Sequence, residues 1–159
     1  MGRYPSKRTN KNLMKIEILC EGKIKRDHNI SLCNEYCDRV RKLKRSGVTE
    51  LKINKLSSNI LNNIRKKNQT LYVLSENGKF IGTKDLLYII KNSLMKCNKI
   101  IYFVIGNANG LNFDYKNYVN LSLGKLTFTH SLTRLIFCEQ IYRCVTQLIN
   151  HPSVSYTHL

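Results

Sequence analysis

The sequence lacks several features that would assign it to common classes of protein. It contains no apolar run of about 18 residues, so it predicts no transmembrane helix. None of its six cysteines forms a C-x-x-C pair, and its histidines and cysteines show no spacing typical of metal ligands. We therefore expect reduced thiols in a cytoplasmic protein, with no catalytic metal and no membrane partner.

Two common phosphate-binding loops are also missing. Gly106 and Gly110 follow an apolar run, but their spacing is not the G-x-G-x-x-G of dinucleotide-binding proteins. No G-K-[ST] string of a P-loop is present either. The bare stretch "FVIGNANGL" is therefore either an ordinary tight turn or a place where a ligand lies against the backbone.

Acidic residues are scarce. The 159 residues, enough for one domain, include 10 Asp and Glu against 27 Lys and Arg, which gives a formal charge of +17. Such an excess favours a polyanionic partner, because neutralising phosphates releases their counterions. RNA is the partner that we expect. The alternative is a solvated basic surface, since the many Lys, Asn and Ile residues also suit an AT-rich genome.

Strand and helix patterns alternate along the chain. Strands are expected from Met14, at 49–53, at 70–75 and at 99–106. Helices are expected through 33–40 with an end near Gly47, from a cap at Thr83 with Asp85 in the first turn, at 114–118 and at about 131–150. The pair Asn77-Gly78 is typical of a turn that ends the third strand. The alternation predicts an α/β fold with a mostly parallel sheet flanked by helices.

Ligands of such sheets bind beyond the carboxyl ends of the strands, which points to the loops after Leu74, Ile105 and Leu123. In "LSLGKLTFTH", bare backbone beside Leu and Phe side chains suits a flat adenine ring, and the alternative is a hydrophobic turn packed on the core. His130 and Arg134 lie one turn apart at the start of the last helix, where anions are favoured. The alternative there is a capping-region histidine and a surface arginine.

Three strings, "FVIGNANGL", "LSLGKLTFTH" and "RLIFCEQIYR", together resemble the RlmH family of SPOUT-superfamily methyltransferases. "MKIEILCEGKIK" and "LSENGK" are similar to segments of the same family, and the resemblance extends over residues 14–152. It implies an α/β fold with a C-terminal trefoil knot, and a homodimer in which each site is completed by the partner chain. The implied activity is S-adenosyl-L-methionine-dependent methylation of ring nitrogen 3 of a pseudouridine in 23S ribosomal RNA, on assembled ribosomes.

The resemblance also implies a set of site residues. Methyl transfer from a sulfonium to a ring nitrogen is an in-line displacement that requires loss of the imide proton. A base, or a cation that stabilises the developing anion, would assist it, and His130 and Arg134 are the candidate catalytic residues. The motif match assigns cofactor binding to Leu74, Gly106, Leu123, Gly124, Lys125, Leu126, Thr127 and Phe128.

The chain departs from the family pattern in several places. Asn107 stands where the family usually has a second glycine, and Thr129 and Ser131 replace the usual Pro and Gln around the motif histidine. The stretch between the first strand and "TLYVLS" is shorter than usual, which predicts that part of a helix or an edge strand is missing.

The two ends of the chain are interpreted separately. Residues 1–13 are a basic N-terminal extension, either disordered or upstream of a true start at Met14. The family ends in H-P-Y-H and a basic residue, whereas this chain has His151-Pro152 followed by "SVSYTHL". Tyr156 and His158 are either a displaced version of that ending, or residues 153–159 are a non-family artefact from read-through of an artificial sequence end.

Two other functions compete with methylation. A non-catalytic basic RNA-binding protein would use its charge together with the aromatic residues Phe113, Tyr115 and Tyr118 near a basic loop. A folded but inactive truncated homologue would follow from the altered tail.

Overall fold

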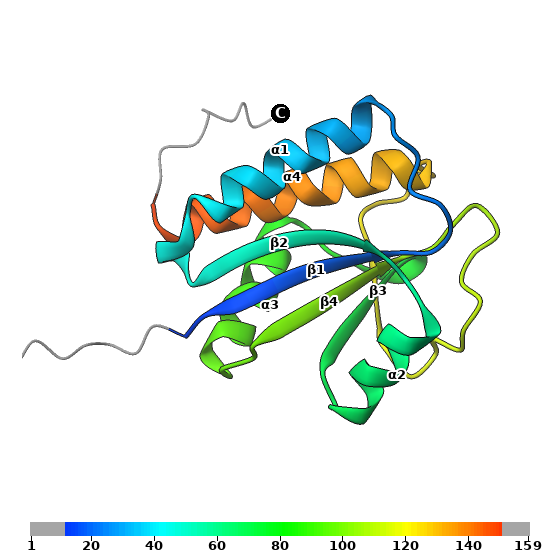
Figure 1. The fold of residues 1–159 in the computed structure, drawn as a ribbon, viewed down its shortest axis with the longest axis horizontal. Coiled ribbons are helices and arrows are strands. Elements are labelled where there is room, and N and C mark those ends of the chain that lie inside the picture. Colours follow the sequence, from blue (N-terminus) through cyan, green and yellow to red (C-terminus); the bar gives the residue numbers. More distant parts are fainter. Residues whose placement is uncertain (1–11, 151–159) are drawn as a thin grey trace, which may run out of the picture.

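A five-stranded parallel sheet forms the centre of the fold in the computed structural model, which describes residues 12–150 (Figure 1). The strand order is β2-β1-β4-β3-β5, and every neighbouring pair is parallel, so the predicted parallel α/β architecture is confirmed. The strands are β1 (Met14–Cys20), β2 (Val48–Lys55), β3 (Thr70–Phe80), β4 (Ile100–Ile105) and β5 (Val119–Ser122). The helices are α1 (His28–Arg41), a short 3-10 helix (Lys44–Ser46), α2 (Ser58–Lys66), α3 (Thr83–Met95) and α4 (His130–Leu148).

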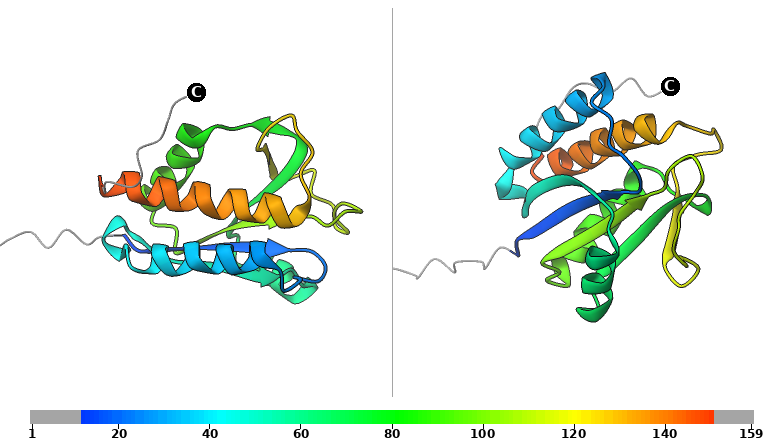
Figure 2. Two further views of the ribbon diagram at one scale, coloured as in Figure 1. Left: turned by 90° about the horizontal axis from the view of Figure 1, so that it is seen from above. Right: turned by 45° about the vertical axis from the view of Figure 1, so that its right-hand side comes forward.

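Helices cover both faces of the sheet. On one face α1 and α4 lie side by side and α4 also packs on α3, as Figure 2 shows from above. The other face is covered by α2 and by the segment between β4 and β5. Because successive side chains of a strand point to opposite faces, Phe103 of β4 joins the first layer while Tyr102 and Val104 join the second. Burial on both faces explains why β4 is a continuous apolar run.

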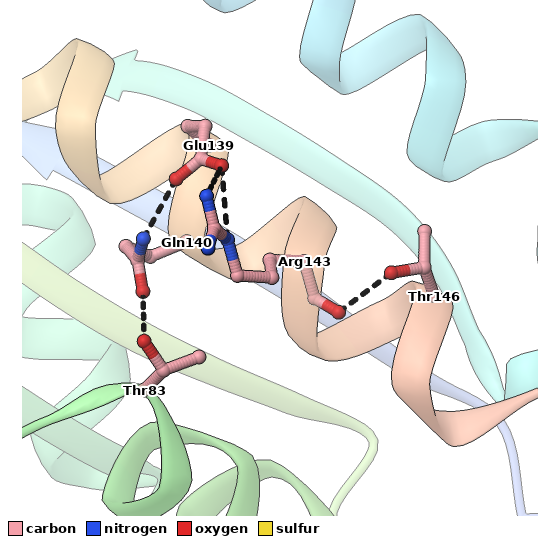
Figure 3. Close-up of polar contacts among 5 residues, drawn as sticks. All are labelled: Thr83, Glu139, Gln140, Arg143 and Thr146. Carbon is pink, nitrogen blue, oxygen red and sulfur yellow. Dashed lines mark hydrogen bonds and ion pairs between the residues drawn. The ribbon is translucent and has the colours of Figure 1, made fainter. Parts of the chain in front are cut away.

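Polar side chains fix α4 against α3 (Figure 3). The hydroxyl of Thr83 donates to the side-chain oxygen of Gln140 over 2.6 Å, and the Gln140 amide donates to Glu139 over 2.7 Å. Arg143 closes this chain by donating from Nε and Nη2 to the other oxygen of the same carboxylate, at 3.0 and 2.6 Å. Since Glu139 and Arg143 are also one turn apart, the ion pair supports the middle of α4.

Two local predictions were wrong, and one helix was missed. The cap of α3 is Gly82, whose N–H donates to Asp85 over 2.8 Å, and the Thr83 hydroxyl is used for α4 instead. The expected helix at 114–118 is a turn in which the Tyr118 N–H donates to the Tyr115 carbonyl. The sequence reading also missed α2, a polar helix of which only Leu61 and Ile64 are buried. Its detectable signal was the cap at Ser57, whose hydroxyl accepts from the Ile60 N–H.

The pair Asn77-Gly78 does not end the third strand. β3 continues to Phe80, and Leu121 of β5 pairs with both Leu74 and Lys79 across an irregular register. A Cβ built on Gly78 would lie 2.6 Å from the carbonyl carbon of Asn120 and 2.6 Å from the Leu121 nitrogen. Glycine is therefore needed here because the backbone of β5 passes directly against it, and not because of a turn.

Gly78→Ala is expected to lower the free energy of unfolding by roughly 1–3 kcal/mol, since the neighbouring atoms are backbone and cannot move aside cheaply. Urea unfolding followed by circular dichroism measures the change. The matched control is Asn77→Ala at the adjacent exposed position, for which a change within about 0.5 kcal/mol is expected. Equal midpoints for the two variants would contradict the steric explanation.

Several predictions concern residues 1–11 and 151–159, which lie outside the described residues. They include most of the predicted N-terminal extension, the predicted artefact at 153–159, and the alternative use of Tyr156 and His158.

Candidate functional site

The middle of β3 and the carboxyl ends of β4 and β5 meet at one end of the sheet and enclose a groove of about 710 Å³. Its walls come from residues 74–77, 105–108, 110–111, 121–124 and 126–130, with Tyr115 and Thr133 completing the lining. The structure brings together the three segments to which the sequence pointed, but the segment after Leu74 is part of β3 and not the loop that was predicted. Parallel pairing places the carboxyl ends of neighbouring strands at the same edge, which is why segments far apart in the chain share one groove.

Seven of the eight predicted cofactor residues line this groove: Leu74, Gly106, Leu123, Gly124, Leu126, Thr127 and Phe128. Lys125 does not line it and is exposed. Leu126 is 72% exposed, so an apolar side chain stands open to solvent at the groove and could cover the flat face of a ligand.

The two glycines of the prediction differ in their surroundings. A Cβ on Gly106 would lie 3.3 Å from the backbone of Gly110, because residues 107 and 110 close a tight turn through two backbone hydrogen bonds. The loop therefore forms a tight turn and also contributes to one wall of the groove. A Cβ on Gly124 would meet nothing within 4 Å, but its φ of +156° is a conformation that L side chains rarely adopt.

Sequence reasoning missed several polar residues of the groove. Ser75, Glu76 and Asn77 follow Leu74 directly and line it, as does Asn107. The first three belong to the "LSENGK" string, which resembles a segment of the family and could have indicated them. Glu76 is exposed, so the groove offers one carboxylate to a ribose hydroxyl or to a positively charged group.

His130 lies in the groove lining at the start of α4. Thr129 caps this helix, and its hydroxyl accepts from the Leu132 N–H over 3.2 Å. The capped end of α4 therefore presents the imidazole to the same space as the bare backbone of the two glycine loops.

The structure does not bring Arg134 into the groove with His130. Its side chain is only 3% exposed, and within residues 12–150 its Nε has no hydrogen-bond partner. It lies behind the start of α4, where its charge acts on Asp27 of the β1–α1 loop. The pKa of Asp27 is held below its usual value chiefly by the Ile30 N–H, then by the Ser131 hydroxyl, with Arg134 contributing less. A catalytic role for Arg134 stays a prediction.

The aromatic residues of the competing RNA-binding hypothesis are half-buried. Phe113 makes edge contacts with Tyr115 and Tyr118, and all three pack against the second core layer. Arg65 of α2 donates to the Tyr118 hydroxyl over 3.0 Å. The rings thus close the sheet face beside α2.

The cysteines are all free thiols, five of them buried. Cys33 and Cys37 face α4 in the core, as their helical spacing predicted, and burial raises the pKa of Cys144 to about 12. Among residues 12–150 there is no group of three or more potential metal ligands. Over the same range, no helix has both the length and the apolar character needed to cross a membrane.

A groove at the carboxyl edge of a parallel sheet, lined by bare backbone and apolar side chains, defines an α/β protein that can hold a small, flat organic molecule. The chain belongs to the SPOUT methyltransferase family: residues 14–153 match a family model described as "Predicted SPOUT methyltransferase".

Curated relatives match most of the chain. Over 133 residues the chain is 40% identical to the ribosomal RNA large subunit methyltransferase H of Prochlorococcus marinus (strain MIT 9215), covering 82% of this chain and 88% of that protein. A protein of the same name from Mycoplasma mycoides subsp. mycoides SC is 36% identical over 151 residues, covering 87% and 97%. A solved structure of a putative RNA methyltransferase of the TrmH family from Porphyromonas gingivalis gives a TM-score of 0.47 at 13% identity, over 82% of this chain and 60% of that one. At that TM-score the likeness adds nothing to the family assignment.

Proposed function

We propose that this protein methylates the RNA of the large ribosomal subunit with S-adenosylmethionine bound in the groove. The observation that carries the proposal is that seven of the eight residues assigned to the cofactor by motif line a single groove in a chain of the SPOUT methyltransferase family. The target that we propose is ring nitrogen 3 of a pseudouridine in 23S ribosomal RNA, on assembled ribosomes in the cytoplasm.

The groove suits this cofactor in size and chemistry. Its volume of about 710 Å³ falls within the range of small-molecule sites. Leu123, Leu126 and Phe128 offer apolar contact to the adenine, and Gly106 and Gly124 present no side chain to it. The carboxylate of Glu76 complements the positive charge of the sulfonium.

S-adenosylmethionine held by the groove residues would supply the methyl group for ring nitrogen 3, with the thioether as the leaving group. His130 takes the imide proton of the pseudouridine, since it is the predicted catalytic group that lines the groove. The Asp27 carboxylate accepts from the Ser131 hydroxyl over 2.9 Å and so holds the residue next to His130. Arg134, the other predicted catalytic residue, is buried outside the groove lining.

The trefoil knot and the homodimer belong to the same proposal. The knot is supported by the membership of the chain in the SPOUT methyltransferase family. The dimer is supported by four large apolar side chains that are exposed in a single chain and could be buried against a partner. They are Phe80 on β3, Val119 on β5, Leu126 in the loop before α4 and Leu132 on α4.

Transfer of radiolabelled methyl groups to undermethylated ribosomes tests the proposal. Label is expected in 23S ribosomal RNA at one pseudouridine, and its absence with this chain and with a chain carrying Tyr-His-Arg after Pro152 would contradict it. Activity only with the repaired chain would identify an inactive truncated homologue. RNA binding without any calorimetric binding of S-adenosylmethionine would favour the non-catalytic RNA-binding alternative.

A further inference from the structure

We propose that residues 23–28, in the β1–α1 loop and at the first residue of α1, form an RNA-docking surface that holds backbone phosphates flanking the nucleotide in the groove. The inference rests on the proposed function and names a surface which that function leaves unassigned. We call residues 23–28 the basic loop. Together with the first turns of α1 it borders a hollow of about 830 Å³ on the protein surface.

The basic loop carries positive charge that no described residue neutralises. Lys23, Lys25 and Arg26 are exposed, and none of them is within ion-pair distance of an acidic side chain in residues 12–150. The acidic residue inside the loop, Asp27, accepts from the Ile30 N–H and the Ser131 hydroxyl, both over 2.9 Å. Three exposed cations on one short loop attract a polyanion, and phosphates that replace their counterions gain affinity.

Hydrogen bonds tie the basic loop and the chain just before it to residues that neighbour two walls of the groove. On one side, Glu21 at the end of β1 accepts from the Asn112 N–H at 3.0 and 3.3 Å, which ties it to the β4–β5 segment. On the other side, Asp27 accepts from Ser131, and Asn29 donates to the same hydroxyl over 3.1 Å. Figures 1 and 2 show the β1–α1 loop, the β4–β5 segment and the start of α4 at one end of the molecule.

This placement selects RNA as the occupant. A nucleotide that enters the groove toward His130 brings its neighbouring phosphates to the rim, where the basic loop is anchored one residue away at Ser131. The net charge of +17 on the whole chain also favours a negatively charged strand as the occupant. Phosphate contacts of this kind position the strand without reading its sequence.

The test compares two triple variants that remove the same charge. The first is Lys23→Gln, Lys25→Gln and Arg26→Gln. The control is Lys42→Gln, Lys44→Gln and Arg45→Gln at the opposite end of α1, about 20 Å away along the helix. These control residues are also exposed and also make no ion pair with a described residue. Thermal unfolding of both variants establishes that they are folded.

Binding to a 20-nucleotide single-stranded RNA that contains pseudouridine is measured by fluorescence anisotropy over a range of salt concentrations. The first variant is expected to bind about tenfold or more weakly at low salt. Its plot of log affinity against log salt should be less steep by up to about 2, because each lost phosphate contact removes about 0.7 from the slope. The control variant is expected to stay within about threefold of the unmodified protein.

Equal losses in both variants, or an unchanged salt slope in the first, would overturn the docking surface. Competition by polyglutamate as effective as that by RNA of equal charge would also overturn it, in favour of an acidic protein partner.

The proposed function and the docking surface are tested separately, because calorimetry measures the affinity for S-adenosylmethionine independently of RNA binding. RNA binding through the basic loop without methyl transfer, both in the unmodified protein and in the chain carrying Tyr-His-Arg after Pro152, would defeat the proposed function alone. Full methyl transfer with an unchanged KM for ribosomes in the first variant would defeat the docking surface alone.

Discussion

Gly106→Leu is expected to weaken binding of S-adenosylmethionine by at least about 100-fold, because a branched side chain at the end of β4 fills the groove that the cofactor would occupy. The added side chain has nowhere else to go: a Cβ at this position already lies 3.3 Å from Gly110 and 3.3 Å from Leu111 on the loop side. Isothermal titration calorimetry measures the affinity, and methyl transfer should fall with it.

Asn109→Leu is the matched control for this substitution. Residue 109 lies in the same loop and is exposed, but it does not line the groove. The control should keep its affinity for S-adenosylmethionine within about threefold, since the groove is unchanged. Melting temperatures of both variants are compared because Gly106→Leu also crowds its own loop. Undiminished affinity in Gly106→Leu would place the cofactor elsewhere.

His130→Gln is expected to slow methyl transfer by roughly 100-fold or more while leaving the affinity for S-adenosylmethionine nearly unchanged. Glutamine keeps a polar side chain of similar length at the start of α4 but cannot accept the imide proton. Single-turnover transfer to undermethylated ribosomes measures the effect on the chemical step apart from product release.

Thr133→Ala serves as the control for His130→Gln, since Thr133 lines the groove from the next turn of the same helix wall. Its hydroxyl donates to the Thr129 carbonyl within the helix, so its loss should change turnover only a few-fold. Near-normal single-turnover rates in His130→Gln would remove the imidazole from the proton transfer and leave solvent to accept the proton.

The sequence anticipated those parts of the fold where one local pattern decides the structure. The uninterrupted apolar run of β4 fits a strand covered on both faces, and the long apolar stripe of α4 fits a helix packed on two others. The groove followed from the same logic, because parallel strands bring their carboxyl ends to one edge regardless of detail. Leu74, Gly106 and Leu123 could therefore be placed together without knowledge of any contact.

Other parts depend on contacts that no local pattern records. Gly78 has a turn-like neighbour, Asn77, but its lack of a side chain serves the backbone of β5, which arrives from more than 40 residues further along the chain. Thr83 looked like a cap, whereas its hydroxyl bonds to Gln140 on α4. In both cases tertiary structure overrides a sound local preference.

Arg134 illustrates the same limit at the site. Its position one turn after His130 predicts a shared face, but helix geometry does not say whether that face points to the groove or to the core. The structure buries the guanidinium behind the helix beside the thiol of Cys20 and the carboxylate of Asp27. A charged side chain that is 3% exposed has lost most of its hydration, so its fixed charge is felt more strongly by its neighbours.

The hydroxyl of Ser131 links the start of α1 to the start of α4. It receives a hydrogen bond from Asn29 and gives one to Asp27, so the opening turns of α1 and α4 are clamped to each other through a single oxygen atom. If RNA binds the basic loop as proposed, these two hydrogen bonds connect the bound strand to the first turn of α4, which carries His130.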